Sequence, residues 1–374
     1  MSIYFITGAT GVVGNEIAAR LLADSDSRLL LLIRAPDDAQ ALARLDELAA
    51  YWRMDPHAVR MRAAVIRGDT ALPQFGLSEA QYRALHEAVT HIVHCAALVR
   101  MNLPLEQALR SSVRSAANVI QLARACRASG QLEKVEFLST VGIAGRMPGT
   151  LPERWVGEER TFHNTYEQAK AEAELLVADA CAAGLPITVT RPSMVVGNAG
   201  SGRILRFQVF YHLVEFLSGS RTRGIYPALG AARIDLVPVD FVSRVVTWSS
   251  TTMDTAGRIL HLCSGPAEAL PLVELRELVR ARLRALGHAV PRAYTVPTPL
   301  LRMAIPLARA LVPAEAKRAL GTLPIFLDYL ESEQSFGNEQ TKRLLARTGV
   351  QVPVPREFVG PVLDYYLAQR GSRA

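Results

Sequence analysis

Residues 3–14 read IYFITGATGVVG, and this stretch decides the fold. Its first four residues form an apolar run typical of a buried parallel strand, and the residues after the glycines carry apolar side chains at helical spacing. Three glycines occupy the turn between strand and helix. Gly8 allows a tight bend, Gly11 lets the backbone approach an anion, and Gly14 lets the helix pack closely on the strand. Because the N-terminus of the helix then faces the turn, the stretch predicts a phosphate-binding site.

The glycine spacing is G-x-x-G-x-x-G, whereas the common dinucleotide fingerprint is G-x-G-x-x-G. Any strand-to-helix turn can collect glycines, so the spacing alone also fits a purely structural turn. The order of strand, turn and helix at the first strand of the chain favours dinucleotide binding. The contacts predicted for this turn are Gly8, Thr10, Gly11, Val12, Val13 and Gly14.

The second apolar strand is followed by Arg34, twenty residues after Gly14. An acidic residue at this position would bind the ribose 2′-hydroxyl of NAD. A guanidinium instead suits a 2′-phosphate through paired hydrogen bonds, so the sequence favours NADPH over NADH. Arg44, ten residues further on, is either a second phosphate contact or part of a solvated helix face.

Two further strand ends carry residues that suit the cofactor. Asp69 and Thr70 follow the third predicted strand and are expected near the adenine, although an aspartate there is also typical of an ordinary turn. Ala96 and Ala97 follow the fourth, and their small side chains let a cofactor lie across the strand end. In parallel α/β sheets, ligands bind at these carboxyl ends.

Strands alternate with helices along the first two thirds of the chain. The strands are expected at 3–6, 28–33, 62–67, 91–95, 135–139, 187–190, 234–239 and 259–262, and a long amphipathic helix is expected over 105–128. This alternation predicts an α/β fold of the Rossmann type, with a doubly wound parallel sheet.

A smaller, mostly helical lobe is expected beside the sheet. Residues 1–197 are predicted to form the NADP-binding core, to which 231–263 return. Residues 198–230 and 264–374 are predicted to form a substrate-binding lobe, because they combine an aromatic helix over 207–217 with a helical pattern punctuated by prolines.

Residues 299–312, PLLRMAIPLARALV, are strongly apolar, and their two arginines share a helix face. Most segments of this kind are core or cap helices. The alternative is an amphipathic helix that contacts a membrane surface or guards the entrance for a lipid-like substrate.

Composition narrows the class of protein. Half of the 374 residues are hydrophobic (49%), which indicates a folded globular protein. The four cysteines lie far apart and form no C-x-x-C pair, a pattern typical of reduced thiols in a cytoplasmic protein without a metal site. No signal peptide and no apolar run long enough to span a membrane are expected.

The formal net charge is +7 at pH 7. An arginine-rich composition of this kind often reflects only a GC-rich genome, and this is the first explanation. The functional alternative is attraction to phosphorylated ligands, such as a phosphorylated cofactor, a coenzyme A ester or an acidic carrier protein. No basic run is interleaved with aromatic residues, so nucleic acid is not an expected partner.

Tyr166 and Lys170 form a Y-x-x-x-K pair, which places both side chains on one helix face a turn apart. A free tyrosine has a pKa near 10, and a neighbouring ammonium favours the phenolate. The fifth predicted strand ends in Ser139 and Thr140, and a hydroxyl there can bind a substrate carbonyl beside the tyrosine. Together these groups predict a polar site for hydride transfer from a nicotinamide.

Several motifs together resemble the extended short-chain dehydrogenase/reductase superfamily, and more closely its thioester-reductase and fatty acyl-CoA reductase branch, the male-sterility-type reductases. They are TGATGVVG at 7–14, LLIRAPDDAQALARLDEL at 31–48, GDTALPQFGLS at 68–78, LSTVGIAG at 138–145, YEQAK at 166–170, RPSMVVG at 191–197 and DLVPVD at 235–240. The resemblance runs from residue 1 to about 250.

The resemblance implies roles for individual residues. Thr140 would orient the substrate carbonyl, Tyr166 would donate the proton, and Lys170 would bind the nicotinamide ribose and lower the pKa of the tyrosine. The nicotinamide would be lined by Ser139, Pro192 and Val195, the adenine would lie near Asp69 and Thr70, and Arg34 and Arg44 would hold the 2′-phosphate. Many members carry asparagine near Ser111 and Ser112 and at Cys95, where this chain does not.

The sequence therefore predicts an NADPH-dependent reductase that transfers hydride to the carbonyl of an apolar substrate. That substrate is an acyl thioester or aldehyde, or a ketone of secondary metabolism, and a thioester would arrive on coenzyme A or a separate carrier protein. The resemblance also implies homo-oligomers. Two alternatives remain: an NAD-dependent nucleotide-sugar epimerase or dehydratase, and a non-catalytic nucleotide-binding regulator.

Overall fold

The computed structural model describes residues 1–374 except 100, 102, 221, 301–302, 304–333 and 372–374. Its centre is a seven-stranded sheet in which all neighbouring strands are parallel. In spatial order the strands are β12 (Ile259–Leu262), β7 (Ile187–Pro192), β5 (Lys134–Leu138), β4 (His91–His94), β1 (Ile3–Thr7), β2 (Arg28–Ile33) and β3 (Ala63–Arg67). The strand order reverses between β1 and β4, which is where such sheets bind ligands.

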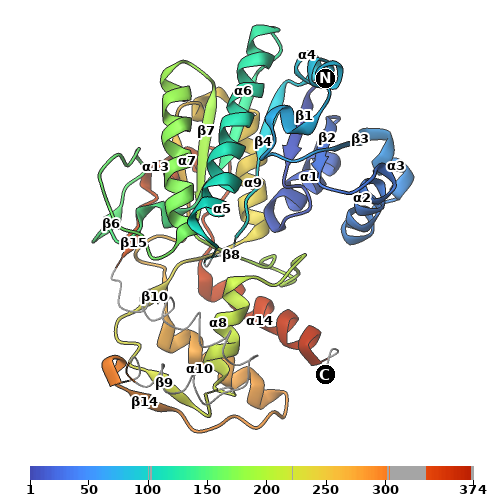
Figure 1. Cartoon of the computed structure of the whole chain (residues 1–374). Helices are drawn as coiled ribbons and strands as arrows, with labels where there is room; N and C mark the ends of the chain where they lie inside the picture. The colour runs from blue at the N-terminus through green and yellow to red at the C-terminus, as the bar shows by residue number, and fades with distance from the viewer. Residues whose placement is uncertain (100, 102, 221, 301–302, 304–333, 372–374) are drawn as a thin grey trace.

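Helices cover both faces of this sheet (Figure 1). One face packs on α1 (Val12–Asp24), α2 (Asp38–Trp52), α3 (Pro56–Arg62) and α9 (Val239–Ser250), and the other on α4 (Glu79–Ala88), α6 (Ser115–Ala128) and α7 (Thr165–Ala182). Each face of the sheet has its own apolar core, and successive residues of β1 point into opposite cores. Tyr4 and Ile6 face the first group of helices, and Phe5 faces the second. The predicted doubly wound Rossmann-type fold is therefore confirmed.

The predicted strands of the sheet agree with the structure to within two residues, and 28–33 and 259–262 coincide with β2 and β12. The helix expected over 105–128 contains a wider π-helical turn. It comprises α5 (Leu105–Leu109), the π turn η2 (Arg110–Arg114) and α6. Short 3₁₀ turns are η1 (Pro73–Gly76), η3 (Val141–Ala144) and η4 (Met253–Thr255).

The strand expected over 234–239 is divided in the structure. It forms β10 (Arg233–Ile234) and β11 (Leu236–Pro238), which pair with β13 (Leu270–Pro271) and β8 (Met194–Val196) respectively. The residue between them, Asp235, accepts hydrogen bonds from the backbone N–H groups of Ser264 and Gly265 at 2.8 and 3.0 Å. This anchor interrupts the strand, so its two parts belong to different ladders.

The lobe is mostly helical and has its own apolar core, which lies below the sheet in Figure 1. Its helices are α8 (Val209–Ser218), α10 (Leu272–Ala285) and α14 (Pro355–Gly371), and β9 (Ile225–Pro227) pairs with β14 (Tyr294–Val296). The limits of core and lobe at 197, 231 and 263 stay predictions.

Part of the C-terminal third returns to the core, although the sequence analysis placed all of 264–374 in the lobe. Strand β15 (Ser335–Phe336) pairs with β6 (Thr150–Leu151), and α13 (Glu339–Leu345) packs beside β12. Glu153 accepts hydrogen bonds from the backbone N–H groups of Gln340 and Thr341 at 2.6 and 3.0 Å. These contacts join segments that are far apart in sequence.

Most of the apolar segment 299–312 lies outside the described residues. Within the described part of the chain, no helix is long and apolar enough to cross a membrane.

Candidate active site

The glycine turn between β1 and α1 has the close contacts that its sequence predicts. The N–H of Gly11 donates to the carbonyl of Gly8 at 2.8 Å. A Cβ added to Gly14 would lie 2.3 Å from that carbonyl oxygen, and one added to Gly8, whose φ is +74°, would lie 2.7 Å from the backbone N of Ala96. Only glycine fits these two positions. Gly11 caps α1 without a side chain, so the first N–H groups of the helix can bind an anion.

A cavity of about 340 Å³ opens beside this turn, at the carboxyl ends of β5 and β7. Eleven of the predicted site residues line it: Gly11, Val12, Val13, Gly14, Ala97, Ser139, Thr140, Tyr166, Lys170, Pro192 and Val195. The structure therefore brings the predicted catalytic residues and the predicted nicotinamide contacts together in one place.

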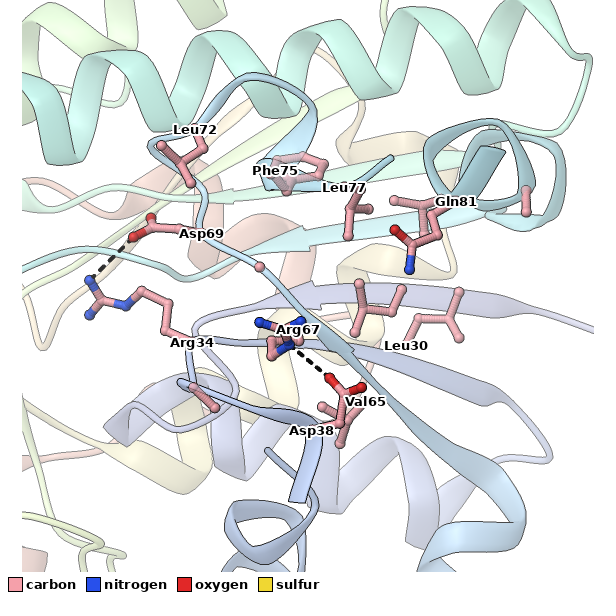
Figure 2. A pocket seen from close by; sticks show the side chains of 16 residues that line it. Leu30, Arg34, Asp38, Val65, Arg67, Asp69, Leu72, Phe75, Leu77 and Gln81 are labelled. Atoms are coloured by element: carbon pink, nitrogen blue, oxygen red, sulfur yellow. Dashed lines mark hydrogen bonds and ion pairs between the residues drawn. The ribbon is translucent and has the colours of Figure 1, made fainter. Parts of the chain in front are cut away.

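Arg34 and Asp69 lie in a second, more open cleft of about 700 Å³ at the ends of β2 and β3. Figure 2 shows the Arg34 side chain reaching across to Asp69, and the two groups are 3.8 Å apart. Arg44 donates a hydrogen bond to the backbone carbonyl of Arg34, so the two arginines lie side by side. Arg34 is largely exposed and is therefore accessible to an anion.

The remaining predicted contacts, Gly8, Thr10, Thr70 and Ala96, line neither cavity. Gly8 and Ala96 touch each other behind the glycine turn, where they set its distance from the end of β4. Thr70 presents its carbonyl to the side-chain amide of Asn118 at 2.8 Å, which fixes the loop after β3.

Thr140 is the N-cap of η3, the short turn that follows β5. Its hydroxyl oxygen accepts a hydrogen bond from the N–H of Gly142 at 3.1 Å. This bond uses one lone pair of the oxygen and leaves the hydroxyl hydrogen available for donation to a group in the cavity.

Tyr166 and Lys170 lie one turn apart on α7, as their spacing predicts. Lys170 is 3% exposed, and its ammonium donates to the carbonyl of Leu138 at 2.9 Å. Burial lowers the pKa of Lys170 to about 8. Burial, and next the charge of Glu167, raises the pKa of Tyr166, whereas the resemblance implied that Lys170 lowers it. The difference arises because the ammonium is held by the Leu138 carbonyl and burial disfavours the phenolate.

A dinucleotide fits the groups that surround the cavity. The hydroxyl of Ser139 is buried and has no hydrogen-bond partner among the described residues, although buried polar groups are usually paired. The glycine turn supplies a cradle that side chains at Gly8 and Gly14 would fill. An anionic ligand at the turn and a polar ring beside Ser139 would satisfy both features.

Residues 6–246 match a family model of NAD-binding domains described as male sterility protein. The chain belongs to this family. The sequence-based recognition of the male sterility family is thus confirmed, and so is the oxidoreductase class.

The proteins that this chain resembles include large enzymes. L-2-aminoadipate reductase of Schizosaccharomyces pombe is 28% identical over 275 residues, which are 70% of this chain and 19% of that protein. One of the proteins that make up the linear gramicidin synthase of Brevibacillus parabrevis is 26% identical over 373 residues, 96% of this chain and 7% of that protein. The chain thus spans about a fifth or less of the length of these relatives.

Among solved structures, the terminal R domain from the myxalamid PKS-NRPS biosynthetic pathway has the same fold. The TM-score is 0.81 at 25% identity, and the alignment covers 99% of this chain and 91% of that one. The male sterility family and these relatives agree with the predicted NAD(P)H-dependent reduction of a carbonyl group.

Several lining residues of this family member were missed by the sequence analysis. They include Met101, Glu167, Arg233, Asp235, Leu272, Gln334 and Phe336. Gln208, Phe210 and Leu213 also line the cavity, and they belong to the aromatic helix that the sequence predicted for the substrate-binding lobe. Asp235 belongs to the quoted motif DLVPVD, which is the one signal that could have identified it. Burial raises the pKa of Asp235.

Two histidines near the site are packed against neighbouring side chains. His94 is buried, its Nδ1 lies 2.8 Å from the hydroxyl of Thr7, and burial lowers the pKa of His94 to about 3, so it is neutral. The ring of His163 lies 3.1 Å from the Glu167 carboxylate. In the described ranges, no group of three or more His, Cys, Asp or Glu residues is arranged to hold a metal ion.

Proposed function

We propose that this chain is an NADPH-dependent reductase that acts on the carbonyl group of an apolar acyl thioester or aldehyde. The observation that carries the proposal is the single cavity that holds Thr140, Tyr166 and Lys170 beside the glycine turn. A hydroxyl, a phenol and an ammonium at the carboxyl ends of parallel strands are the groups that carbonyl reduction needs.

NADPH is the proposed cofactor because of the arginines at the end of β2. Arg34 is exposed at the position that selects between the ribose forms, and Arg44 is held beside it through the Arg34 carbonyl. A 2′-phosphate there would gain two cationic contacts. The carboxylate of Asp69, 3.8 Å from Arg34, would then face the adenine side of the site.

The cofactor, when bound, supplies the hydride. Thr140 donates its hydroxyl hydrogen to the substrate carbonyl oxygen, while the Gly142 N–H holds the hydroxyl oxygen in place. Tyr166 gives its phenolic proton to the same oxygen as negative charge develops there. Its raised pKa keeps the phenol protonated at neutral pH. Lys170 provides a buried cation one turn further along α7, where it also suits the ribose hydroxyl groups.

The lobe contributes apolar side chains to the cavity wall. Phe210 and Leu213 of α8 and Leu272 of α10 form part of its wall. Burying an acyl chain against these side chains is favourable by about 25 cal/mol for each Å² of apolar surface. This wall supports a substrate with a hydrocarbon chain or ring next to its carbonyl group.

An acyl thioester carried on coenzyme A or on a carrier protein is the proposed form of the substrate. The support comes from relatives named as part of a gramicidin synthase and as a terminal R domain of a PKS-NRPS pathway, together with the aminoadipate reductase. Contact of 299–312 with a membrane and assembly into homo-oligomers stay predictions.

NADPH oxidation, followed at the nicotinamide absorbance, tests the proposal. The substrates are a series of acyl-CoA esters, long-chain aldehydes and aromatic or polyketide ketones, with Tyr166→Phe as the comparison. Turnover of one class that falls by about 10²- to 10⁴-fold in Tyr166→Phe supports the reductase. NADPH binding without turnover, or NAD that copurifies and stays bound, would instead favour the regulator or the epimerase.

A further inference from the structure

Glu167 follows Tyr166 on the first turn of α7, and its charged side chain is only 3% exposed. Its backbone N–H donates to the side chain of Asn164, the N-cap of the helix, at 3.0 Å. Its carboxylate turns back and accepts hydrogen bonds from the backbone N–H and Nδ1 of His163 at 3.0 and 3.1 Å. Such a capping arrangement works equally well when it is exposed to water, so the burial of Glu167 has another cause.

That cause lies on the other side of the carboxylate. A Cβ added to Gly142 would lie 3.2 Å from Cγ of Glu167 and 3.4 Å from Oγ1 of Thr140. The Glu167 side chain therefore packs on the Gly142 turn, on the side that also faces the hydroxyl of Thr140. The Gly142 N–H also holds this hydroxyl, at 3.1 Å. A shift of the turn would consequently shift the Thr140 hydroxyl with it.

We propose that Glu167 is a positioning residue of the active site, which holds the Gly142 turn and thereby fixes the Thr140 hydroxyl relative to Tyr166. The inference rests on the proposed reductase function. Both groups bind one carbonyl oxygen, so their separation decides how well they stabilise the charge that develops on it. Displacement of a catalytic group by about 1 Å can lower the rate by about a hundredfold.

The charge of Glu167 is compatible with this place in the fold. A carboxylate on the first turn of a helix is stabilised by the partial positive charge of the N-terminus. After burial, the Glu167 charge is the second cause that raises the pKa of Tyr166. The residue that fixes the turn therefore also favours the protonated phenol, the form that can donate a proton.

A double-mutant cycle in the full chain tests the inference. Glu167→Ala removes the side chain that supports the turn, and Thr140→Val removes the hydroxyl through which Glu167 is proposed to act. Glu167→Ala is expected to lower kcat by about ten- to a hundredfold in the native chain, but by less than about threefold when Thr140→Val is already present. The KM for NADPH is expected to stay within about twofold in both backgrounds, because Glu167 and Thr140 lie outside the Gly8–Gly14 turn between β1 and α1.

Two further variants distinguish the proposed positioning role of Glu167 from an effect of its charge and from general destabilisation of α7. Glu167→Gln keeps the shape of the side chain, so its kcat is expected to stay within about threefold of the native value. Glu172 lies on the same helix but outside the cavity, where its carboxylate accepts a hydrogen bond from Gln168 at 3.0 Å. Glu172→Ala is therefore the matched control, and it is expected to leave kcat unchanged.

Equal losses from Glu167→Ala in both backgrounds would overturn the inference, because Glu167 would then act independently of Thr140. A loss in Glu167→Gln as large as in Glu167→Ala would overturn it as well, since charge and not packing would be the cause. If the native chain reduces no carbonyl substrate, the proposed function itself fails, and that result is distinct from both of these.

Discussion

Arg191 and Glu174 form a buried ion pair between β7 and α7, with Nε and Nη2 of the arginine 3.0 and 2.6 Å from the two carboxylate oxygens. Neither side chain is more than 5% exposed. Arg191 immediately precedes Pro192, which lines the cavity, and Glu174 lies one turn beyond Lys170. The pair therefore joins the strand that leads to the cavity to the helix that carries Tyr166.

Removal of one partner leaves the other as an uncompensated buried charge. Glu174→Ala is expected to lower the free energy of unfolding by about 3–5 kcal/mol. Urea unfolding of the two proteins, compared at one pH, measures this difference. Arg83→Ala is the control, because it breaks an exposed ion pair with Glu79 and should cost less than about 1 kcal/mol. A change below about 1 kcal/mol in Glu174→Ala would contradict the prediction.

Arg34→Ala is expected to raise the KM for NADPH by about ten- to a hundredfold and to leave the KM for NADH within about twofold. A hydrogen bond to a charged group contributes about 1.5–3 kcal/mol, and only NADPH offers the 2′-phosphate. Steady-state kinetics with each cofactor gives both values. Arg28→Ala, at the opposite end of the same strand, serves as control. Equal losses with the two cofactors would show that Arg34 does not select the phosphate.

Gly14→Ala is expected to destabilise the fold by about 1–3 kcal/mol and to abolish tight binding of the dinucleotide. The new Cβ would lie 2.3 Å from the Gly8 carbonyl oxygen, so α1 would have to move away from β1. Thermal unfolding with and without NADPH measures both effects. Gly157→Ala has no atom within 4 Å of the new Cβ and should change neither. Unaltered cofactor stabilisation in Gly14→Ala would refute the proposed role of the turn.

Lys170 gives the stability of the cofactor-free protein a defined pH dependence. Burial lowers the pKa of Lys170 to about 8, below the value of about 10.4 in an unfolded chain. Between these two values the unfolded chain binds more protons at this position, so the contribution of Lys170 to the free energy of unfolding rises with pH. Urea unfolding at pH 7.5 and 10 should therefore show the native chain gaining stability relative to Lys170→Met. A difference that is constant with pH would contradict this.

The sheet could be predicted because its signals are local. Each strand of the doubly wound core is a short apolar run between turn residues, and the glycine turn after β1 specifies the first crossover. The Y-x-x-x-K pair on α7 was predictable for the same reason, since residues four apart on a helix necessarily share a face.

The rest of the site depends on contacts between distant parts of the chain. Phe336 reaches the cavity because β15 pairs with β6, which lies about 185 residues earlier. No local sequence pattern predicts this pairing. The direction of the Tyr166 pKa shift could not be predicted from the sequence either. It depends on burial of Tyr166 by several elements and on the Leu138 carbonyl that holds the Lys170 ammonium. Arg44 was ambiguous until the fold placed it beside Arg34.

The return of 334–345 to the core has a consequence for the construction of hybrid enzymes. Gln334 and Phe336 form part of the cavity wall, and Glu153 accepts a hydrogen bond at the start of α13. The following helix, α14, belongs to the lobe. An exchange of lobes between related reductases at a single junction near residue 264 would also replace this wall and separate Glu153 from its partners. A transplant of the lobe residues after 263 that preserves the cavity wall needs three junctions, near residues 264, 334 and 345, with 334–345 inherited from the parent that provides the sheet.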